Sequence, residues 1–401
     1  MNQYSVVILS PEVPKPEPTS AGERLIRELY LTLVDLGHRP IFMAPRPRQA
    51  FEGQYDVEHY FLPEPSALLA RLDRLKARFN TWMPSLGILQ VLTSDPQARR
   101  LLAQASIIDL QWSSIAALAP ALARINPSAQ LLATFHDVNQ QRMDRRSQQE
   151  SKDFKGQLKA LTWTLQGKGS AFFDRLAGRY LDQALVLSEK DRKLLPLRPH
   201  DRPKIKVLAP PVYIDQQKVL PPKTEGKEIL FVGTMYRWEN HQAMIWFIRE
   251  VLPKVWKEHP LATLKIAGAG ALDELVSTAA QDQRIELLGF VDDLEPVYAR
   301  ASLAVAPIHL GSGVKFKTLD ALLRGLPLVS TWAGMEGVGK NSWAAAVTNL
   351  PQTFAEAVNQ VLANPAPYRS QAASSRVEAV NYYSSAAYRR RVQEVYGAPQ
   401  A

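Results

Sequence analysis

The strongest candidates for a ligand-binding or catalytic role are two lysines in a glycine-rich segment, Gly311-Ser-Gly-Val-Lys-Phe-Lys317. Gly311 and Gly313 would let the backbone approach a ligand closely. We expect a helix to start within this segment, and helix N-termini offer N–H groups and the positive end of a dipole. Together with the charges of Lys315 and Lys317, this pattern fits a diphosphate, above all a leaving group that gains charge during reaction. The simpler alternative is a turn with two solvated lysines.

Two further residues of the second half suit a nucleotide ligand. Asp320 lies one helical turn beyond Lys317, so its carboxylate could accept hydrogen bonds from ribose hydroxyls. It could equally form a surface ion pair with Lys317. Gly268, in Gly268-Ala-Gly270 after an expected strand, is a weak dinucleotide signal, because Asp273 stands where a third glycine would be needed.

In the first half, the segment Thr134-Phe-His136-Asp137 follows an apolar run. At such a strand end, His136 could donate a hydrogen bond to a sugar hydroxyl or to developing charge. The alternative is a histidine with a structural role. Gly22 begins the first expected helix and could let a substrate approach the backbone, or it could be a simple helix-start glycine.

The elements that must position these residues alternate regularly in the second half. Apolar strand-like runs separated by helical spacing occupy residues 229–234, 264–268, 285–290, 303–307 and 327–331. Such alternation predicts a parallel sheet covered by helices on both faces. Ligands bind these sheets outside the carboxyl ends of the strands, where the glycines and lysines fall.

The first half shows a similar but looser pattern. Expected strands lie at residues 6–9, 39–43, 107–110, 131–134, 181–188 and 205–208, and a helix over residues 20–36 ends at Gly37. Residues 51–100 are less regular. A proline-containing linker is expected at 209–215 and a surface loop at 218–227. A chain of 401 residues fits two such α/β domains.

Composition excludes several classes of protein. With 46% hydrophobic and 22% charged residues, the chain reads as a globular protein. The absence of cysteine excludes disulfides, thiolate metal sites and cysteine nucleophiles. No apolar run is long enough for a membrane span, and the start lacks a basic leader, so we expect a cytoplasmic protein. The seven histidines show no metal-binding spacing, and no Gly-x-Ser-x-Gly elbow occurs.

The net charge of +9 lies almost entirely in the first half, with 29 basic and 21 acidic residues before position 211 and 19 and 18 after it. Such asymmetry suggests an anionic partner, among nucleic acid, phosphorylated substrate and acidic membrane, or only a solubilising surface. Arg142, Arg145, Arg146, Lys152, Lys155 and Lys159 precede Leu161, Trp163, Phe172 and Phe173. This run could be a basic, aromatic membrane-surface element or a buried helix with one solvated face.

These residues together resemble the family-4 glycosyltransferases of the GT-B fold. The strongest match is Phe231-Val-Gly-Thr234, Gly311-Ser-Gly-x-Lys-x-Lys317, Leu319-Asp-Ala321, Gly325-x-Pro-Leu-Val-Ser330 and Gly334-x-Glu-Gly337. Weaker matches are Ser20-Ala-Gly22, Thr134-Phe-His-Asp137, Ala184-Leu-Val-Leu-Ser188 and Ile205-Lys-Val-Leu-Ala-Pro-Pro211. The resemblance covers nearly the whole chain, except that residues 45–105 match no motif.

The resemblance implies an α/β fold of two Rossmann-like domains facing across a cleft. Residues 1–210 would bind the acceptor, residues 211–382 the sugar nucleotide, and residues 383–401 would return as a helix to the first domain. Gly233, Thr234, Lys315 and Lys317 would touch the diphosphate, and Asp320 the ribose. His136 would touch the donor sugar, and Gly22 would lie by the phosphates or the acceptor. The remaining expected substrate-binding residues are Arg237, Gly268, Gly311, Ser312, Gly313 and Val314.

The implied reaction is a metal-independent transfer with retention at the anomeric carbon, from a nucleotide-diphosphate sugar to a saccharide or lipid-linked saccharide. No cofactor beyond the sugar nucleotide and no nucleic acid partner is expected. Synthesis of a cell-surface glycan would place the protein in the cytoplasm, with the inner face of an anionic membrane as an expected docking surface.

Two other classes stay open at this stage. Many relatives carry two glutamates separated by seven residues, where this chain has Ser312 and Asp320. That departure favours, as an alternative, a non-catalytic glycosyltransferase-like subunit that binds acceptor for an active partner. A nicotinamide oxidoreductase is disfavoured by the missing Gly-x-Gly-x-x-Gly.

Overall fold

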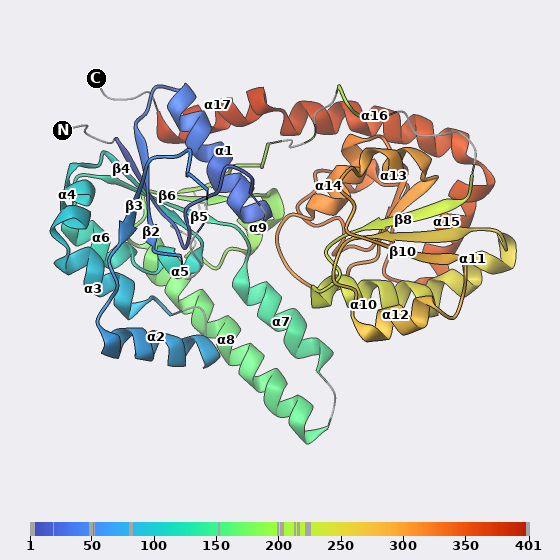
Figure 1. Cartoon of the computed structure of the whole chain (residues 1–401), viewed down its shortest axis with the longest axis horizontal. Helices are drawn as coiled ribbons and strands as arrows, with labels where there is room; N and C mark the ends of the chain where they lie inside the picture. The colour runs from blue at the N-terminus through green and yellow to red at the C-terminus, as the bar shows by residue number, and fades with distance from the viewer. Residues whose placement is uncertain are drawn as a thin grey trace. The chain divides into compact units, whose positions relative to one another are not determined.

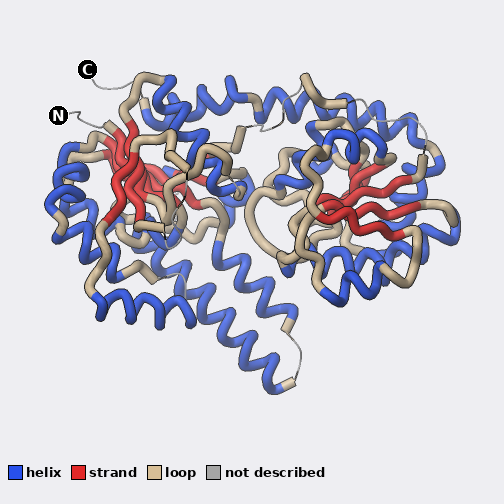
Figure 2. The backbone as a smooth tube through the Cα atoms, viewed as in Figure 1, coloured by secondary structure: helices blue, strands red, loops and turns tan. Residues whose placement is uncertain are grey.

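The computed structural model describes residues 5–18, 20–47, 51, 53–79, 83–150, 153–198, 200, 204–211, 214, 217–220 and 226–397. The chain forms two compact units, which we call unit 1 (residues 1–211 and 385–401) and unit 2 (residues 212–384). The two divisions lie close to the expected ones at 210/211 and 382/383. Each unit has its own parallel sheet flanked by helices (Figures 1 and 2).

Unit 1 contains a seven-stranded parallel sheet in the order β3-β2-β1-β4-β5-β6-β7. Its strands are β1 Val6–Leu9, β2 Pro40–Pro45, β3 His59–Leu62, β4 Ile107–Gln111, β5 Gln130–Phe135, β6 Gln183–Val186 and β7 Ile205–Val207. Its helices are α1 Ala21–Asp35, α2 Ala67–Phe79, α3 Leu86–Ser94, α4 Pro96–Gln104, α5 Ser113–Ala116, α6 Ala119–Ile125, α7 Asn139–Gln149, α8 Phe154–Gly178, α9 Glu189–Leu194 and α17 Ser385–Tyr396.

Local sequence explains the elements of unit 1 that matter for the site. All four residues of β1 are buried, as expected for an inner strand of a sheet covered on both faces. Helix α1 starts where the Ser20 side chain accepts a hydrogen bond from the backbone N–H of Glu23. It ends before Gly37, whose φ of 91° is the left-handed value that glycine adopts readily.

Unit 2 contains a six-stranded parallel sheet in the order β10-β9-β8-β11-β12-β13. Its strands are β8 Glu228–Val232, β9 Thr263–Ala267, β10 Ile285–Gly289, β11 Leu303–Ala306, β12 Leu328–Ser330 and β13 Ala346–Val347. Its helices are α10 Trp238–Trp246, a π-helical turn Phe247–Val251, α11 Leu252–Glu258, α12 Asp273–Ala279, α13 Glu295–Arg300, α14 Phe316–Leu323, a 3-10 turn Asn341–Trp343, α15 Pro351–Ala363 and α16 Pro365–Tyr383.

The expected helix following the first strand of unit 2 is divided. The helical spacing predicts one helix near residues 240–259, whereas α10 and α11 are joined by the π-helical turn. Pro253 lies in the first turn of α11 and has no N–H to donate to the preceding turn, which explains the irregular hydrogen bonding just before it.

The C-terminal segment belongs to both units. Helix α16 completes unit 2, and α17 packs against α1 in unit 1. His38 Nε2 lies 3.1 Å from the carbonyl oxygen of Gly397, which joins the end of α17 to the loop after α1. Of the expected linker and surface loop, residues 212, 213, 215 and 221–225 lie outside the described residues. Within the described part of the chain, no helix is long and apolar enough to span a membrane.

Candidate functional site

The glycines and lysines predicted to bind a nucleotide gather at one edge of the unit 2 sheet. Gly233 directly follows β8, Gly268 directly follows β9, and residues 311–315 follow β11. Because β8 is parallel to both β9 and β11, these three turns share the carboxyl edge of the sheet. That edge is where open α/β sheets bind ligands.

The turns after β8 and β9 touch through their backbones. A Cβ at Gly268 would lie 1.9 Å from the carbonyl oxygen of Gly233, far inside contact distance, and the φ of Gly268 is 144°. A Cβ at Gly233 would lie 3.2 Å from Cε of Lys317. Gly268 therefore requires glycine, and a Cβ at Gly233 would be tightly placed against neighbouring side chains. The absence of side chains at both positions leaves backbone exposed where a ligand would approach.

Lys317 is held over the turn after β8. Its Nζ donates to Oδ1 of Asn240 at 2.5 Å, and Nδ2 of Asn240 donates to the carbonyl oxygen of Thr234 at 2.8 Å. Sequence reasoning missed Asn240, which is buried one turn after Arg237. A polar residue at this point of a helix, directly after a glycine turn, was the signal available.

Electrostatics make Lys317 unusual. Burial lowers the pKa of its ammonium group, and the positive charges of Lys315 and Arg237 lower it further. The carboxylates of Glu239 and Asp320 act in the opposite direction, and the result is a pKa of about 7. An added anion would stabilise the charged form of Lys317 and raise this pKa.

Lys315 organises the glycine-rich segment. It occupies the N-cap position of α14, and its buried side chain donates to the carbonyl oxygens of Ser312 at 2.9 Å and Gly313 at 3.0 Å. The glycine-rich loop therefore curves around the ammonium group of Lys315, and the neighbouring Val314 is buried. Both predicted lysines thus lie at the start of α14, and Lys317 lies next to the turn after β8.

Asp320 lies within α14, one turn beyond Lys317. Its backbone carbonyl accepts a hydrogen bond from Nη1 of Arg324 at 3.0 Å. The guanidinium of Arg324 also donates to Oε1 of Glu295 at 2.5 Å. The negative charge of Asp320 raises the pKa of Lys317, so the two side chains share one electrostatic environment.

In unit 1, the structure brings Gly22 and His136 together through a residue that sequence reasoning missed. The ring of His136 stacks on the indole of Trp112 with centroids 3.9 Å apart and an interplanar angle of 7°. A Cβ at Gly22 would lie 2.7 Å from Cζ2 of Trp112. Trp112 follows β4, His136 follows β5, and Gly22 lies in the first turn of α1, which comes after β1. All three therefore lie at the carboxyl edge of the unit 1 sheet.

A hydrogen-bond chain fixes the tautomer of His136. The amide Nε2 of Gln111 donates to Oδ2 of Asp109 at 2.6 Å and to Oγ1 of Thr134 at 3.2 Å. Its Oε1 therefore faces Nε2 of His136 at 2.8 Å, and that nitrogen must be the donor. Because burial lowers the pKa of His136 to about 3, the ring is neutral and Nδ1 carries a lone pair that accepts a hydrogen bond. The N–H that was expected to donate to a sugar hydroxyl is instead bonded to Gln111.

The same chain reaches the C-terminal helix. The hydroxyl of Tyr396 in α17 donates to Oδ2 of Asp109 at 2.9 Å. Burial raises the pKa of Asp109 to about 6, although hydrogen bonds from Tyr396 and Gln111 oppose the shift. The position of His136 therefore depends on the return of α17 to unit 1. Polar residues within the apolar run of β4 were the sequence signal for this network.

The basic run identified in the sequence forms parts of α7 and α8, which pack side by side (Figure 1). Arg142 pairs with Asp137 at 3.2 Å, and the guanidinium of Arg146 lies 5.2 Å from the centroid of the Trp163 ring. Lys152 lies outside the described residues. Part of the expected cationic surface is thus engaged in internal contacts.

The face of α8 turned away from α7 is apolar rather than solvated by polar groups. Its exposed large side chains, spaced three, four or seven residues apart, are Phe154, Leu158, Leu161, Leu165 and Phe172, which we call the α8 stripe. Phe154 is 82% exposed. Helix α8 thus has a buried side and a solvent-exposed face, as one of the two interpretations expected, but large apolar side chains occupy the exposed face.

Comparison with known proteins gives a family match within unit 2. Residues 226–364 match the sequence model of the family described as "Glycosyl transferases group 1". An uncharacterized 44.6 kDa protein in the cps region of Klebsiella pneumoniae is 36% identical over 120 residues, 28% of this chain and 31% of that protein. Glycogen synthase of Mycobacterium tuberculosis is 30% identical over 165 residues, 39% of this chain and 38% of that protein. The matches span about a third of the length of these curated relatives.

Solved structures match over the whole chain. Sucrose-phosphate synthase from Thermosynechococcus elongatus has a TM-score of 0.68 at 14% identity, with 98% of both chains covered. HepE from Anabaena, solved with UDP and glucose, has a TM-score of 0.64 at 13% identity, covering 98% of this chain and 99% of that one. WaaG, a glycosyltransferase involved in lipopolysaccharide biosynthesis, has a TM-score of 0.63 at 15% identity, covering 98% of this chain and all of that one.

These likenesses confirm the predicted α/β fold with two parallel-sheet units of the GT-B type. Together with the family match in unit 2, they confirm the resemblance to group 1 glycosyltransferases. Residues 226–364 are therefore similar to group 1 glycosyltransferases, and the chain as a whole has a GT-B fold.

Proposed function

We propose that this protein transfers a sugar from a nucleotide-diphosphate donor, bound by unit 2, to a saccharide acceptor, bound by unit 1. The observation that carries the proposal is the environment of Lys317, which Asn240 holds beside the backbone turn at Thr234. The repulsion from Lys315 and Arg237 that lowers its pKa would be relieved by a bound diphosphate. Negative charge growing on a leaving diphosphate would be stabilised by the same groups.

The proposed roles of the other residues follow from their places. Gly233, Gly268, Gly311 and Gly313 would let backbone approach the phosphates, with Ser312 and Val314 completing the loop. Asp320 would accept hydrogen bonds from the ribose. In unit 1, the neutral ring of His136 offers Nδ1 as an acceptor for a sugar hydroxyl. HepE was solved with UDP and glucose, which supports a donor of this chemical type.

Retention at the anomeric carbon and independence of metal are part of the proposal. Two lysines at the start of a helix can supply the positive charge that a divalent ion would otherwise bring to a diphosphate. Synthesis of a cell-surface glycan is supported by the likeness to WaaG, which is involved in lipopolysaccharide biosynthesis.

We further propose that unit 1 docks on the anionic inner face of a membrane through the α8 stripe. Lys155, Lys159 and Lys168 lie on the same helix, so basic heads could contact lipid phosphates while the apolar side chains enter the interface. An amphipathic helix of this kind lies on a membrane surface without crossing it. Such docking would bring the enzyme to a lipid-linked acceptor.

The test is release of nucleoside diphosphate from UDP-, GDP-, ADP- and dTDP-hexoses, with a mixture of oligosaccharides as acceptors and EDTA present. We expect one donor to be consumed, with the product linkage keeping the anomeric configuration of the donor. Consumption that requires an added divalent ion would contradict metal independence. Donor binding without any turnover would favour the non-catalytic subunit instead.

A further inference from the structure

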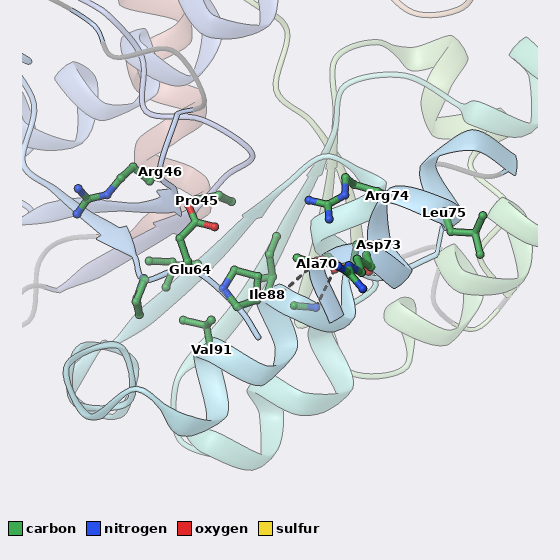
Figure 3. A pocket seen from close by; sticks show the side chains of 15 residues that line it. Pro45, Arg46, Glu64, Ala70, Asp73, Arg74, Leu75, Ile88 and Val91 are labelled. Carbon is green, nitrogen blue, oxygen red and sulfur yellow. Dashed lines mark hydrogen bonds between the residues drawn. The ribbon is translucent and has the colours of Figure 1, made fainter. Parts of the chain in front are cut away.

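A ligand-sized cavity lies in the part of unit 1 that matches no family motif. It measures about 850 Å³ and lies where β2 ends at Pro45 and β3 ends at Leu62, with α2 and α3 forming the rest of its wall. Small-molecule sites commonly measure about 300–1,000 Å³. Figure 3 shows Arg46 and Glu64 on the strand side, Asp73 and Arg74 on the helix side, and Ile88 and Val91 between them.

The charge of this β2–β3 cavity is positive. Three arginines line it, Arg46, Arg71 and Arg74, and no hydrogen bond or ion pair joins any of them to another described residue. Arginine presents a planar fork of donors that matches carboxylate and phosphate groups. Three such side chains around one cavity therefore favour an anionic ligand.

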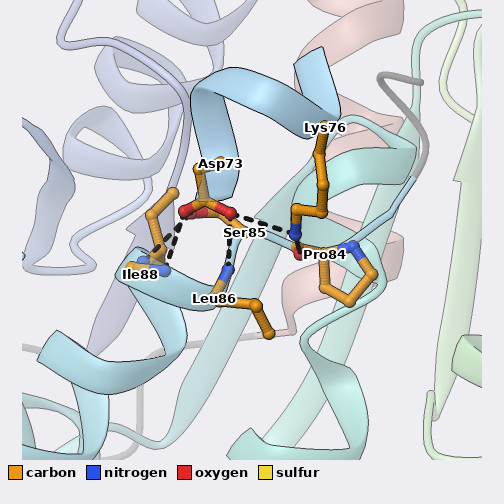
Figure 4. A network of polar contacts seen from close by, with 7 residues as sticks. Asp73, Lys76, Pro84, Ser85, Leu86 and Ile88 are labelled. Carbon is orange, nitrogen blue, oxygen red and sulfur yellow. Dashed lines mark hydrogen bonds and ion pairs between the residues drawn. The ribbon is translucent and has the colours of Figure 1, made fainter. Parts of the chain in front are cut away.

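One of the two carboxylates of the cavity is already neutralised by protein groups. Asp73 accepts hydrogen bonds from Oγ of Ser85 at 2.6 Å and from the backbone N–H groups of Leu86 and Gly87 at 3.0 and 2.8 Å (Figure 4). Nζ of Lys76 lies 3.0 Å from Oδ1 of the same carboxylate. Burial alone would raise the pKa of Asp73, but these bonds together lower it, so the carboxylate is committed to the start of α3. Glu64 is the other carboxylate among the residues that line the cavity.

The rest of the wall is apolar and includes proline rings. Pro45, Leu62, Pro63, Pro65, Ile88 and Val91 contribute to it. Apolar walls with a few charged groups are typical of sites for small organic ligands. The C–H faces of sugar rings, with an acidic group at one edge, would match both parts of this wall.

The cavity and His136 share the carboxyl edge of one parallel sheet. In the order β2-β1-β4-β5, the ends of β2 and β5 are three strand spacings apart, about 14 Å. A ligand that reached both places would be longer than a single sugar ring.

We propose that the β2–β3 cavity binds the anionic group of an acidic oligosaccharide acceptor, a uronate carboxylate or a phosphate, through Arg46, Arg71 and Arg74. This inference rests on the proposed function, since it names the class of acceptor that unit 1 would hold. The acceptor end to be extended would lie toward His136, and the acidic group in the cavity would set the specificity.

Binding of defined sugars to the full chain tests the proposal by calorimetry. The probes are trigalacturonic acid, uncharged maltotriose as a control for size, and glucose 1-phosphate. We expect at least one acidic probe to bind about 10-fold or more tightly than maltotriose. Preference for trigalacturonic acid would assign a glycan carboxylate, and preference for glucose 1-phosphate would assign a phosphate. Equal affinity for all three probes, or no binding of any probe, would overturn the proposal.

The triple variant Arg46→Gln, Arg71→Gln, Arg74→Gln supplies the second test. We expect it to lose the preference for the acidic probe by at least about 10-fold, because three charged donors are removed. The matched control changes three exposed arginines of the same unit that do not line the cavity, Arg99, Arg100 and Arg124, to glutamine and should bind as the wild type does. Equal loss in both variants would show a general charge effect and overturn the site.

Donor binding measured in the same samples separates the two proposals. If the arginine variant loses acidic-sugar binding but still binds its sugar nucleotide, both stand. If sugar nucleotides bind and the acidic preference is absent, only the cavity proposal fails. If no sugar nucleotide binds to the wild type, the proposed function fails first.

Discussion

The ring of His136 lies flat on the indole of Trp112, with centroids 3.9 Å apart. Trp112 reaches this position with a φ of 70°, a left-handed value that costs a non-glycine residue about 1–3 kcal/mol. Gly22 leaves the space, since a Cβ there would lie 2.7 Å from the indole. Backbone strain at one residue and a missing side chain at another thus permit a single ring stack, which orients the histidine.

The variant His136→Ala should lower turnover while leaving nucleoside-diphosphate affinity nearly unchanged. The reason is that His136 belongs to unit 1, whereas the predicted phosphate-binding residues belong to unit 2. Calorimetry with the nucleotide beside steady-state rates measures both effects, with His59→Ala as a control histidine of unit 1. A correctly folded variant that had lost nucleotide affinity would remove His136 from the sugar site.

Replacing either lysine, Lys315→Ala or Lys317→Ala, should lower kcat by at least ~10²-fold if each stabilises the leaving diphosphate. Lys315 also holds the carbonyl oxygens of Ser312 and Gly313, so its loss should loosen the loop as well. Steady-state kinetics of both single variants and of the double variant measure this effect. Near-wild-type rates in all three would reject the phosphate assignment.

Sugar-nucleotide affinity should fall as the pH rises above 7. Without a ligand, Lys317 has a pKa of about 7, and a bound diphosphate would raise that pKa. At a pH between the two pKa values, binding of the sugar nucleotide therefore takes up a proton. The dissociation constant should therefore increase by up to about 10-fold per pH unit above pH 7. A sugar nucleotide is the right probe because its diphosphate does not titrate near neutral pH. Lys317→Met should abolish the dependence, and an equal slope in that variant would contradict the assignment.

The variant Gly268→Ala should lower the free energy of unfolding by more than about 2 kcal/mol, through positive φ and a clash with the Gly233 carbonyl. Gly289→Ala is the matched control, because Gly289 has a φ of 65° but no atom within 4 Å of its added Cβ. In the control, the free energy of unfolding should fall by only about 1 kcal/mol, from backbone strain alone. Urea unfolding compares the two, and equal losses would show that the turns do not touch.

Membrane docking should depend on the α8 stripe and on salt. Vesicles of anionic and of neutral lipid, at low and high salt, should show binding to the anionic vesicles that salt reverses, because basic residues contribute about 1 kcal/mol each and are screened. Phe154→Ser with Leu158→Ser and Leu165→Ser should abolish it. Leu261, Phe290 and Leu350, which are similarly exposed in unit 2, provide the matched control triple. No preference for anionic vesicles at low salt would reject docking.

Sequence alone predicted the inner strands well, because continuous apolar runs such as Val6–Leu9 are buried on both faces. It missed β3, whose residues His59 to Phe61 are half-exposed at the sheet edge, and β13, which has two residues. The helix over residues 240–259 was expected as one because periodicity does not reveal a π-helical turn. Residues 51–100 show no regular pattern in the sequence, and they contain most of the wall of the β2–β3 cavity.

The candidate site was predictable where its residues are local in sequence. Lys315 and Lys317 belong to one motif, so their approach to the glycine turns followed from strand order. The network of Asp109, Gln111 and Tyr396 was not predictable, since Tyr396 reaches Asp109 across 287 residues of chain. Asn240 was missed because its hydrogen-bond partners, Thr234 and Lys317, are distant in sequence from each other and meet only in the folded unit.

The central claim is that unit 2 binds the diphosphate of a sugar nucleotide through Lys315 and Lys317. The most direct measurement is the thermal stability of the wild type and the double variant Lys315→Ala, Lys317→Ala with a panel of sugar nucleotides and nucleoside diphosphates. A ligand at about 100 times its dissociation constant should stabilise the wild type by about 2.7 kcal/mol and the double variant hardly at all. Equal stabilisation of both proteins, or of neither by any nucleotide, would contradict the account.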